Sequence, residues 1–352
     1  MNLYITIQRT YYANRVMVMT SSPIKVQNPS PNMSLKNTWR IFAEYDDNAK
    51  RQQTDFNRLQ IWILMLGVVA TALALSQTQF RNFFLANSLQ DNAISLVILI
   101  LPITISILVA ARNQFKFGNK WVLLRGVAEA IKREIYVYRM HALNYSDNQR
   151  GQLSREQVLS SRIDAITRQL LQTEVNLSAI KPYYESIEKP IPPRIYAADI
   201  NNDGYSDLTP DDYVRIRIGD QINYYKKRIV QLDLRLNVFQ WLIYITGGIG
   251  TLLAAIGFKL WVALTIALVA LFTTFLEYRQ IQNTLIQYNQ AVTNLVNLQN
   301  WWIALPIDDK KKQENIDRLV DSAETILNSE ITGWVQQMQS AMAKIYEQKP
   351  KQ

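Results

Sequence analysis

The stretch Trp241–Leu276, WLIYITGGIGTLLAAIGFKLWVALTIALVALFTTFL, decides the fold of this chain. Its one charged side chain, Lys259, separates two apolar runs, 241–258 and 260–276. Because an α-helix rises about 1.5 Å per residue, each run forms a helix of about 26 Å, enough to cross the hydrocarbon core of a bilayer. We predict a transmembrane hairpin with Lys259 at its tip, where the long side chain reaches the interface. Two uncharged runs in succession disfavour the alternative, a buried hairpin of a soluble all-α protein.

The first of these runs is rich in small residues, which allow helix backbones to approach closely in lipid. They are Gly247, Gly248, Gly250, Thr251, Ala254, Ala255 and Gly257. We therefore expect this face to pack against a neighbouring helix.

A second hairpin precedes this one, with spans at about 61–80 and 93–111. The chain is thus predicted to be an all-α membrane protein, with four transmembrane helices in two hairpins and long cytoplasmic helical extensions. Basic residues flank the outer ends of both hairpins, whereas the loop 81–92 has only Arg81. The positive-inside rule then places both termini in the cytoplasm, which we interpret as the cytoplasmic side of a bacterial inner (plasma) membrane.

Four regions follow from these patterns. Residues 1–36 form a tail or linker, expected to be disordered; 37–183 form the first two-span unit; 184–211 form a Pro-rich and acidic linker; and 212–352 form the second two-span unit. The two units share one plan, a charged helix, a hairpin, a long exit helix and an amphipathic helix, which suggests a tandem duplication.

Local signals fix several helix ends. Ser154 and Gln157 have the spacing of a capping box, and the helix they open is expected to reach about Ile180. Thr209 followed by Pro210 predicts another helix start. The fourth span is expected to continue through 277–300 without a break, since no helix breaker interrupts it.

Composition excludes several classes of site. The chain has no cysteine and one histidine, His141, which excludes disulfides and disfavours zinc or triad chemistry. No nucleotide-binding or metalloprotease motif is present, so we expect no enzyme, no catalytic residue and no small-molecule substrate. The net charge of +9 is better explained by anionic lipid head groups than by nucleic acid. Glu129, Glu134 and Glu277 could line an ion path, but solvated helix faces are the simpler interpretation.

The acidic turn Ala198–Asp212 is the one ligand-like motif. Its oxygen donors have the spacing of a calcium loop, with Gly204 at the sharp turn and Pro210 in place of the final glutamate. The candidate ligands are Asp199, Asn201, Asp203, the carbonyl of Tyr205, and Asp207. The alternative is a connecting turn that caps the next helix, so calcium remains the one candidate cofactor.

The overall plan resembles the SLATT family of two-transmembrane effector domains, including a subgroup long filed as a domain of unknown function. The resemblance rests on KWVLLRGVAEAIKREIYVYR (Lys120–Arg139), LEYRQIQNTLIQYNQAVTNLVNLQNWW (Leu276–Trp302) and LVDSAETILNSEITGWVQQMQ (Leu319–Gln339). It implies a pore-forming or membrane-perturbing effector without catalytic residues. This chain departs from the family in carrying the plan twice.

Two functional hypotheses follow. The first is an oligomeric pore or membrane effector, gated by the cytoplasmic helices and assembled from copies of this chain in a bilayer with anionic head groups. The alternative is a non-conducting scaffold or sensor that acts through those helices. A secondary transporter is disfavoured because the spans contain no charged residue.

Overall fold

The structure is a computed structural model in which every regular element of the described residues is a helix. It describes residues 31–79, 89–115, 117–168, 170, 173, 175, 179–187, 189–192 and 202–329. Four helices in this part are long and apolar enough to cross a membrane, which confirms the predicted fold class.

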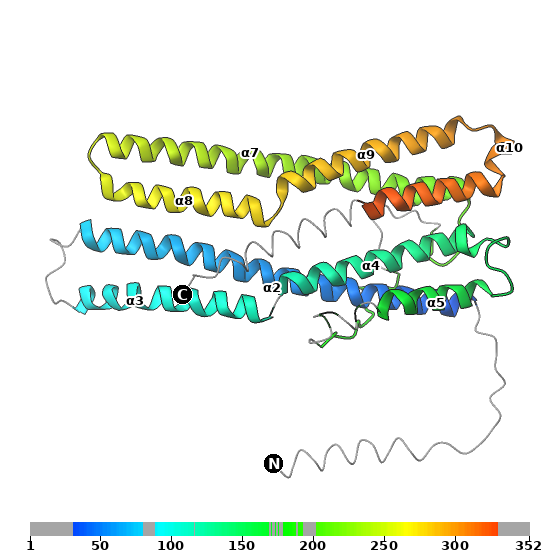
Figure 1. The fold of residues 1–352 in the computed structure, drawn as a ribbon, viewed down its shortest axis with the longest axis horizontal. Helices are drawn as coiled ribbons and strands as arrows, with labels where there is room; N and C mark the ends of the chain where they lie inside the picture. The colour runs from blue at the N-terminus through cyan, green and yellow to red at the C-terminus, as the bar shows by residue number, and fades with distance from the viewer. Residues whose placement is uncertain are drawn as a thin grey trace, which may run out of the picture.

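The first unit is built around one helix of 49 residues. Its elements are α2 (Pro31–Gln79), α3 (Leu89–Phe115), α4 (Phe117–Arg139), a short turn η1 (Leu143–Tyr145) and α5 (Arg155–Arg168). The apolar end of α2 pairs with α3 as a hairpin, and its polar end packs against α4 and α5 (Figure 1). One continuous helix therefore links the polar bundle to the first span.

The second unit repeats this arrangement. Its elements are α6 (Pro210–Tyr213), a π-helical turn η4 (Val214–Gly219), α7 (Asp220–Ala255), α8 (Lys259–Tyr278), α9 (Ile281–Ala304), α10 (Ile307–Lys310) and a helix over 313–329. α7 pairs with α8 in the hairpin and with α9 in the bundle. The hairpin turns between Ala255 and Lys259, where Gly257 has a φ of 90°, a conformation that favours glycine.

The four span-forming helices lie side by side in the order α3, α2, α8, α7 (Figure 1). α2 and α8 make the contact between the two hairpins. At the polar end of this contact, the ring of Phe56 lies edge-on to that of Tyr278, with 6.3 Å between centroids. The hairpins are therefore joined through one helix from each unit.

Polar and small residues hold each hairpin together. In the first, the Arg112 side chain donates to Gln60 at 3.1 Å near one end of the span, and Gln77 donates to Ser95 at 2.6 Å near the other. In the second, Gly250 is buried against Thr265 of α8. Gly247 and Gly248 have open space where a Cβ would be, so within this chain they do not take part in the packing of the hairpin.

Two expected helix limits differ from the structure. α2 begins at Pro31, inside the predicted tail, because Leu35 and Trp39 are buried in the bundle. α5 ends at Arg168 and does not reach Ile180. The capping signals themselves are confirmed: Ser154 and Gln157 bond reciprocally, and Thr209 accepts from the backbone of Asp212.

The expected continuity after the fourth span is also wrong. α8 ends at Tyr278 and α9 begins at Ile281, because Gln280 adopts a left-handed conformation with a φ of 49°. The Gln280 side chain donates to the carbonyl of Glu277 at 2.7 Å, which satisfies a terminal acceptor of α8. The break reorients α9 so that Ile281 and Thr284 are buried.

The bundles of the two units share one hydrophobic core. Tyr136 of α4 meets Tyr213 of α6 edge-on, with 6.4 Å between ring centroids. The guanidinium of Arg217 lies 4.4 Å from the centroid of the same Tyr136 ring. The polar ends of the two units therefore form a single packed body.

Candidate functional site

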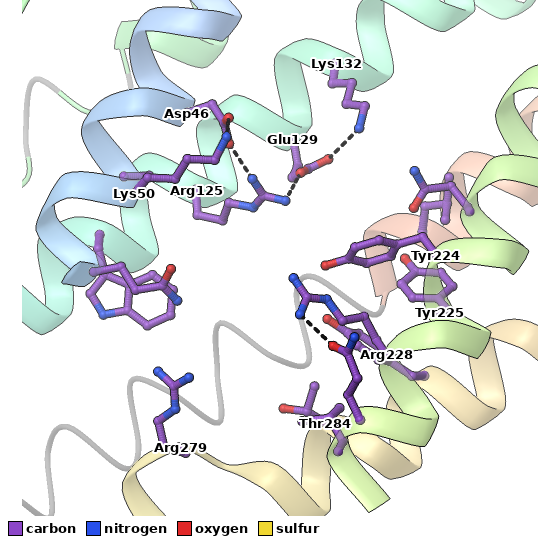
Figure 2. A pocket seen from close by; sticks show the side chains of 18 of the residues that line it. Asp46, Lys50, Arg125, Glu129, Lys132, Tyr224, Tyr225, Arg228, Arg279 and Thr284 are labelled. Atoms are coloured by element: carbon purple, nitrogen blue, oxygen red, sulfur yellow. Dashed lines mark hydrogen bonds and ion pairs between the residues drawn. The ribbon is translucent and has the colours of Figure 1, made fainter. Parts of the chain in front are cut away.

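A cavity of about 560 Å³ lies where the two bundles meet, near the polar ends of the spans (Figure 2). Side chains of α2 and α4 from the first unit form one wall, and residues of η4, α7 and α9 from the second form the other. Its volume is within the range of small-ligand pockets in proteins.

Basic side chains outnumber acidic ones around this cavity, seven to three among the described residues that line it. The basic residues are Lys50, Arg125, Lys132, Arg217, Arg228, Arg235 and Arg279, and the acidic residues are Asp46, Glu129 and Asp220. The site is therefore electropositive.

The first wall carries a connected chain of charges (Figure 2). Arg125 pairs with Asp46 and, at 2.5 Å, with Glu129; Lys50 lies 2.6 Å from Asp46 and Lys132 lies 4.0 Å from Glu129. Burial opposes ionisation of Glu129, but the surrounding cations, Arg125 above all, lower its pKa to about 2. Burial lowers the pKa of Lys132, which the Glu129 carboxylate only partly offsets. Two acids are thus shared among three cations.

The second wall is aromatic and polar. The rings of Tyr224, Tyr225 and Tyr288 form a cluster with centroids 4.8 to 6.3 Å apart. Arg228 lies over the ring of Tyr224 and donates to Gln231 at 3.0 Å, in a position where it points into the space between the walls (Figure 2). This wall presents ring faces, hydroxyls and a guanidinium.

Two arginines stand at the membrane end of the cavity. Arg235 belongs to α7, and Arg279 follows the last residue of α8 directly. Within the described residues neither has a carboxylate within ion-pair distance. Burial and the nearby charge of Arg235 lower the pKa of Arg279.

Asp220, the third acid that lines the cavity, makes no ion pair in the described part of the chain, and burial raises its pKa.

Arg217 differs from these arginines because its charge is neutralised within its own unit. Its side chain donates two hydrogen bonds to Glu324, at 3.0 and 2.9 Å, and the Tyr213 hydroxyl donates a third at 2.9 Å. Arg217 and Glu324 are almost fully buried. This cluster ties η4 to the helix over 313–329 beneath the cavity.

The first unit contains a similar buried carboxylate. Glu134 accepts two hydrogen bonds from Arg162, at 2.6 and 2.9 Å, and one from the Tyr145 hydroxyl at 2.8 Å. The expectation that Glu129 and Glu134 lie on solvated helix faces is therefore wrong, because both are enclosed by cations of the bundle.

The structure places part of the predicted calcium turn against the bundle. Gly204 has a φ of 80°, and the Trp39 indole donates to its carbonyl at 2.8 Å. Arg139 donates to the carbonyl of Ser206 at 2.8 Å and to Asn202 at 2.7 Å. The turn is thus anchored to α2 and α4.

The carboxylates of this turn have protein partners. Asp203 accepts from the backbone of Tyr205 and from the backbone and hydroxyl of Ser206, each at 2.8 Å. Asp207 lies 2.6 Å from His141 and 3.2 Å from Arg155. Asp199 and Asn201 lie outside the described residues, and no group of three metal-binding side chains occurs within them.

Comparison with known families gives two adjacent matches. Residues 213–334 match the family described as SMODS and SLOG-associating 2TM effector domain 1, SLATT_1. The second unit is therefore similar to a SLATT-type domain. Residues 40–152 match DUF4231, a protein family of unknown function. These matches confirm the predicted SLATT-type tandem pair. No curated protein and no solved structure gave a match.

The cavity therefore lies between the DUF4231 unit and the SLATT-type unit, and each supplies part of its charge. Sequence reasoning used Arg228, Arg235 and Arg279 only as topology signals. Their positions near the spans can be read from the sequence, but the packing that places them in one cavity with α2 and α4 of the other unit cannot. No local pattern encodes a contact between residues so distant in the chain.

Proposed function

We propose that this protein is an oligomeric pore-forming or membrane-perturbing effector of the bacterial inner membrane, gated by its cytoplasmic helical bundle. Both termini lie in the cytoplasm, and neither unit acts as an enzyme. The SLATT-type match and the four apolar helices support a membrane effector.

The observation that carries this proposal is the open arrangement of the spans. The four helices lie in a row, and at most 6% of each apolar window is buried within the chain. Such a row encloses no path by itself, so lipid tails or further copies of the chain must cover its two faces. A pore therefore requires several copies, with α3 and α7 free at the two edges for contact with the next copy.

Gating follows from helix continuity. α2 and α7 each run without interruption from the bundle into a span. A shift of one bundle against the other would therefore move the two hairpins, which meet at α2 and α8. The cavity lies at this junction.

The alternative is a non-conducting scaffold or sensor. It is favoured by one specific observation, the absence of charged side chains from 61–79, 93–111, 240–255 and 260–276. Imaging the purified protein in nanodiscs separates the two functions. A symmetric ring with a water-filled axial path is expected for the effector, and a dimer with a lipid-filled centre would contradict it.

Calcium binding by the acidic turn is a separate proposal. Residues Asp199, Asn201, Asp203, Tyr205 and Asp207 would supply oxygen ligands of the kind calcium prefers. Binding only to the folded loop would stabilise the protein by about 2.7 kcal/mol at a hundredfold excess over the dissociation constant. Melting curves with calcium and with chelator test this, with Asp199→Ala as the variant that removes one ligand. An unchanged wild-type midpoint would leave the residues as a capping turn.

A further inference from the structure

Among the described residues, the cavity between the two units is lined by more basic side chains than acidic ones. Its two paired acids, Asp46 and Glu129, already serve three cations of the first wall. Arg235 and Arg279 have no carboxylate partner within the described residues.

Placing unneutralised cations close together in a partly buried site is unfavourable unless an anion joins them. Arg279 is half-buried, and the charge of Arg235 acts on it directly. The arrangement therefore matches a ligand that carries more than one negative charge.

We propose that this cavity binds a phosphate-bearing anion, held by Arg235 and Arg279 at the membrane end and by Arg228 on the tyrosine wall. Guanidinium groups recognise phosphate oxygens through paired hydrogen bonds, and the tyrosine hydroxyls supply further donors. The volume of about 560 Å³ accommodates several phosphate groups or one phosphate with an organic substituent.

The source of the phosphate is either a lipid head group or a soluble molecule. Arg279 follows the span-forming helix α8 directly, which puts it at the level where a head-group phosphate would lie. Because both units line the cavity, a ligand that fills it stabilises one packing of the bundles over others. The effect of this binding on gating rests on the proposed function, whereas the binding of the anion does not.

The test uses the full chain in nanodiscs of phosphatidylcholine, titrated with inorganic pyrophosphate while the melting midpoint is recorded. Wild type should show a saturable rise. Arg235→Gln with Arg279→Gln should raise the apparent dissociation constant about a hundredfold, about tenfold for each arginine. The matched control, Arg168→Gln with Lys312→Gln, removes two exposed charges away from the cavity and should respond as wild type.

A second set of nanodiscs, with phosphatidylglycerol added, separates the two sources. A lipid ligand should raise the wild-type midpoint without pyrophosphate and leave pyrophosphate with no further effect. A soluble ligand should leave the pyrophosphate response intact in both lipids. Neither arm depends on conduction, so failure here is distinct from failure of the pore.

Folding controls keep the test decisive. Arg235 is exposed, so Arg235→Gln alone should fold and still weaken binding about tenfold. Arg235→Lys with Arg279→Lys keeps both charges and should retain most of the response. The proposal is overturned if neither probe raises the wild-type midpoint, or if the double glutamine variant responds as its control does.

Discussion

The guanidinium of Arg217, in the SLATT-type unit, lies 4.4 Å from the ring centroid of Tyr136 in the DUF4231 unit. Its charge is neutralised by Glu324 of its own unit, at 2.9 Å. One buried side chain therefore connects the fold of the second unit to the interface with the first.

This relationship predicts that Glu324→Gln is strongly destabilising. Removing one partner leaves the Arg217 charge buried and unpaired, which costs about 3–5 kcal/mol. Thermal unfolding in detergent measures the change. Replacing both partners, as Glu324→Gln with Arg217→Met, should restore part of the loss. If the double variant is as unstable as the single one, the unpaired charge is not the cause.

A second prediction concerns the packing of the second hairpin. A Cβ at Gly250 would lie 2.5 Å from the Thr265 hydroxyl, whereas one at Gly247 would meet nothing within 4 Å. Gly250→Leu should therefore push α7 away from α8 and cost about 1–3 kcal/mol through overpacking. Gly247→Leu is the matched control, which should unfold close to wild type in the same detergent. Equal destabilisation by both variants would mean that the two helices do not meet at Gly250.

A third prediction concerns pH. The folded-state pKa of Glu129 is about 2, below its ordinary value of 4.5, because Arg125 and its neighbours favour the carboxylate despite burial. A depressed carboxyl pKa contributes stability above the unfolded pKa and loses it as pH falls toward the folded one, here about 3 kcal/mol between pH about 4.5 and 2. The stability gap between wild type and Glu129→Gln should shrink over that range. A gap that is constant from neutral pH down to about 3 would show that Glu129 is not held by these cations.

The topology predicts which sites a membrane-impermeant thiol reagent can reach. The chain has no cysteine, and Lys259, Ser154 and Ser329 are exposed, so single cysteines can be introduced there cleanly. Lys259→Cys should be labelled in intact cells, and the two serine variants only after permeabilisation. Labelling of Ser329→Cys in intact cells would reverse the orientation.

Local features of this fold were predictable because each depends on neighbours in sequence. The capping pairs at Ser154 and Thr209, and the hairpin tip at Lys259, have side-chain signatures within four residues. The break at Gln280 was not predictable, because glutamine carries no preference for the left-handed conformation.

Contacts between the units could not be predicted either. Periodicity shows that a helix has an apolar side but not which distant helix covers it. The pairing of α2 with α8 and the position of Arg217 over Tyr136 are of this kind. The cationic cavity exists only because of such contacts, and its arginines resembled ordinary topology signals in the sequence.

Ion flux from sealed vesicles tests the central claim most directly. The purified protein, reconstituted in vesicles of phosphatidylcholine with phosphatidylglycerol, should release a trapped small-ion reporter, and Gly250→Leu should alter that release more than Gly247→Leu. Vesicles that remain sealed at every protein density, with the protein shown to be inserted and folded, with and without pyrophosphate, would contradict a pore-forming or membrane-perturbing effector and favour the scaffold.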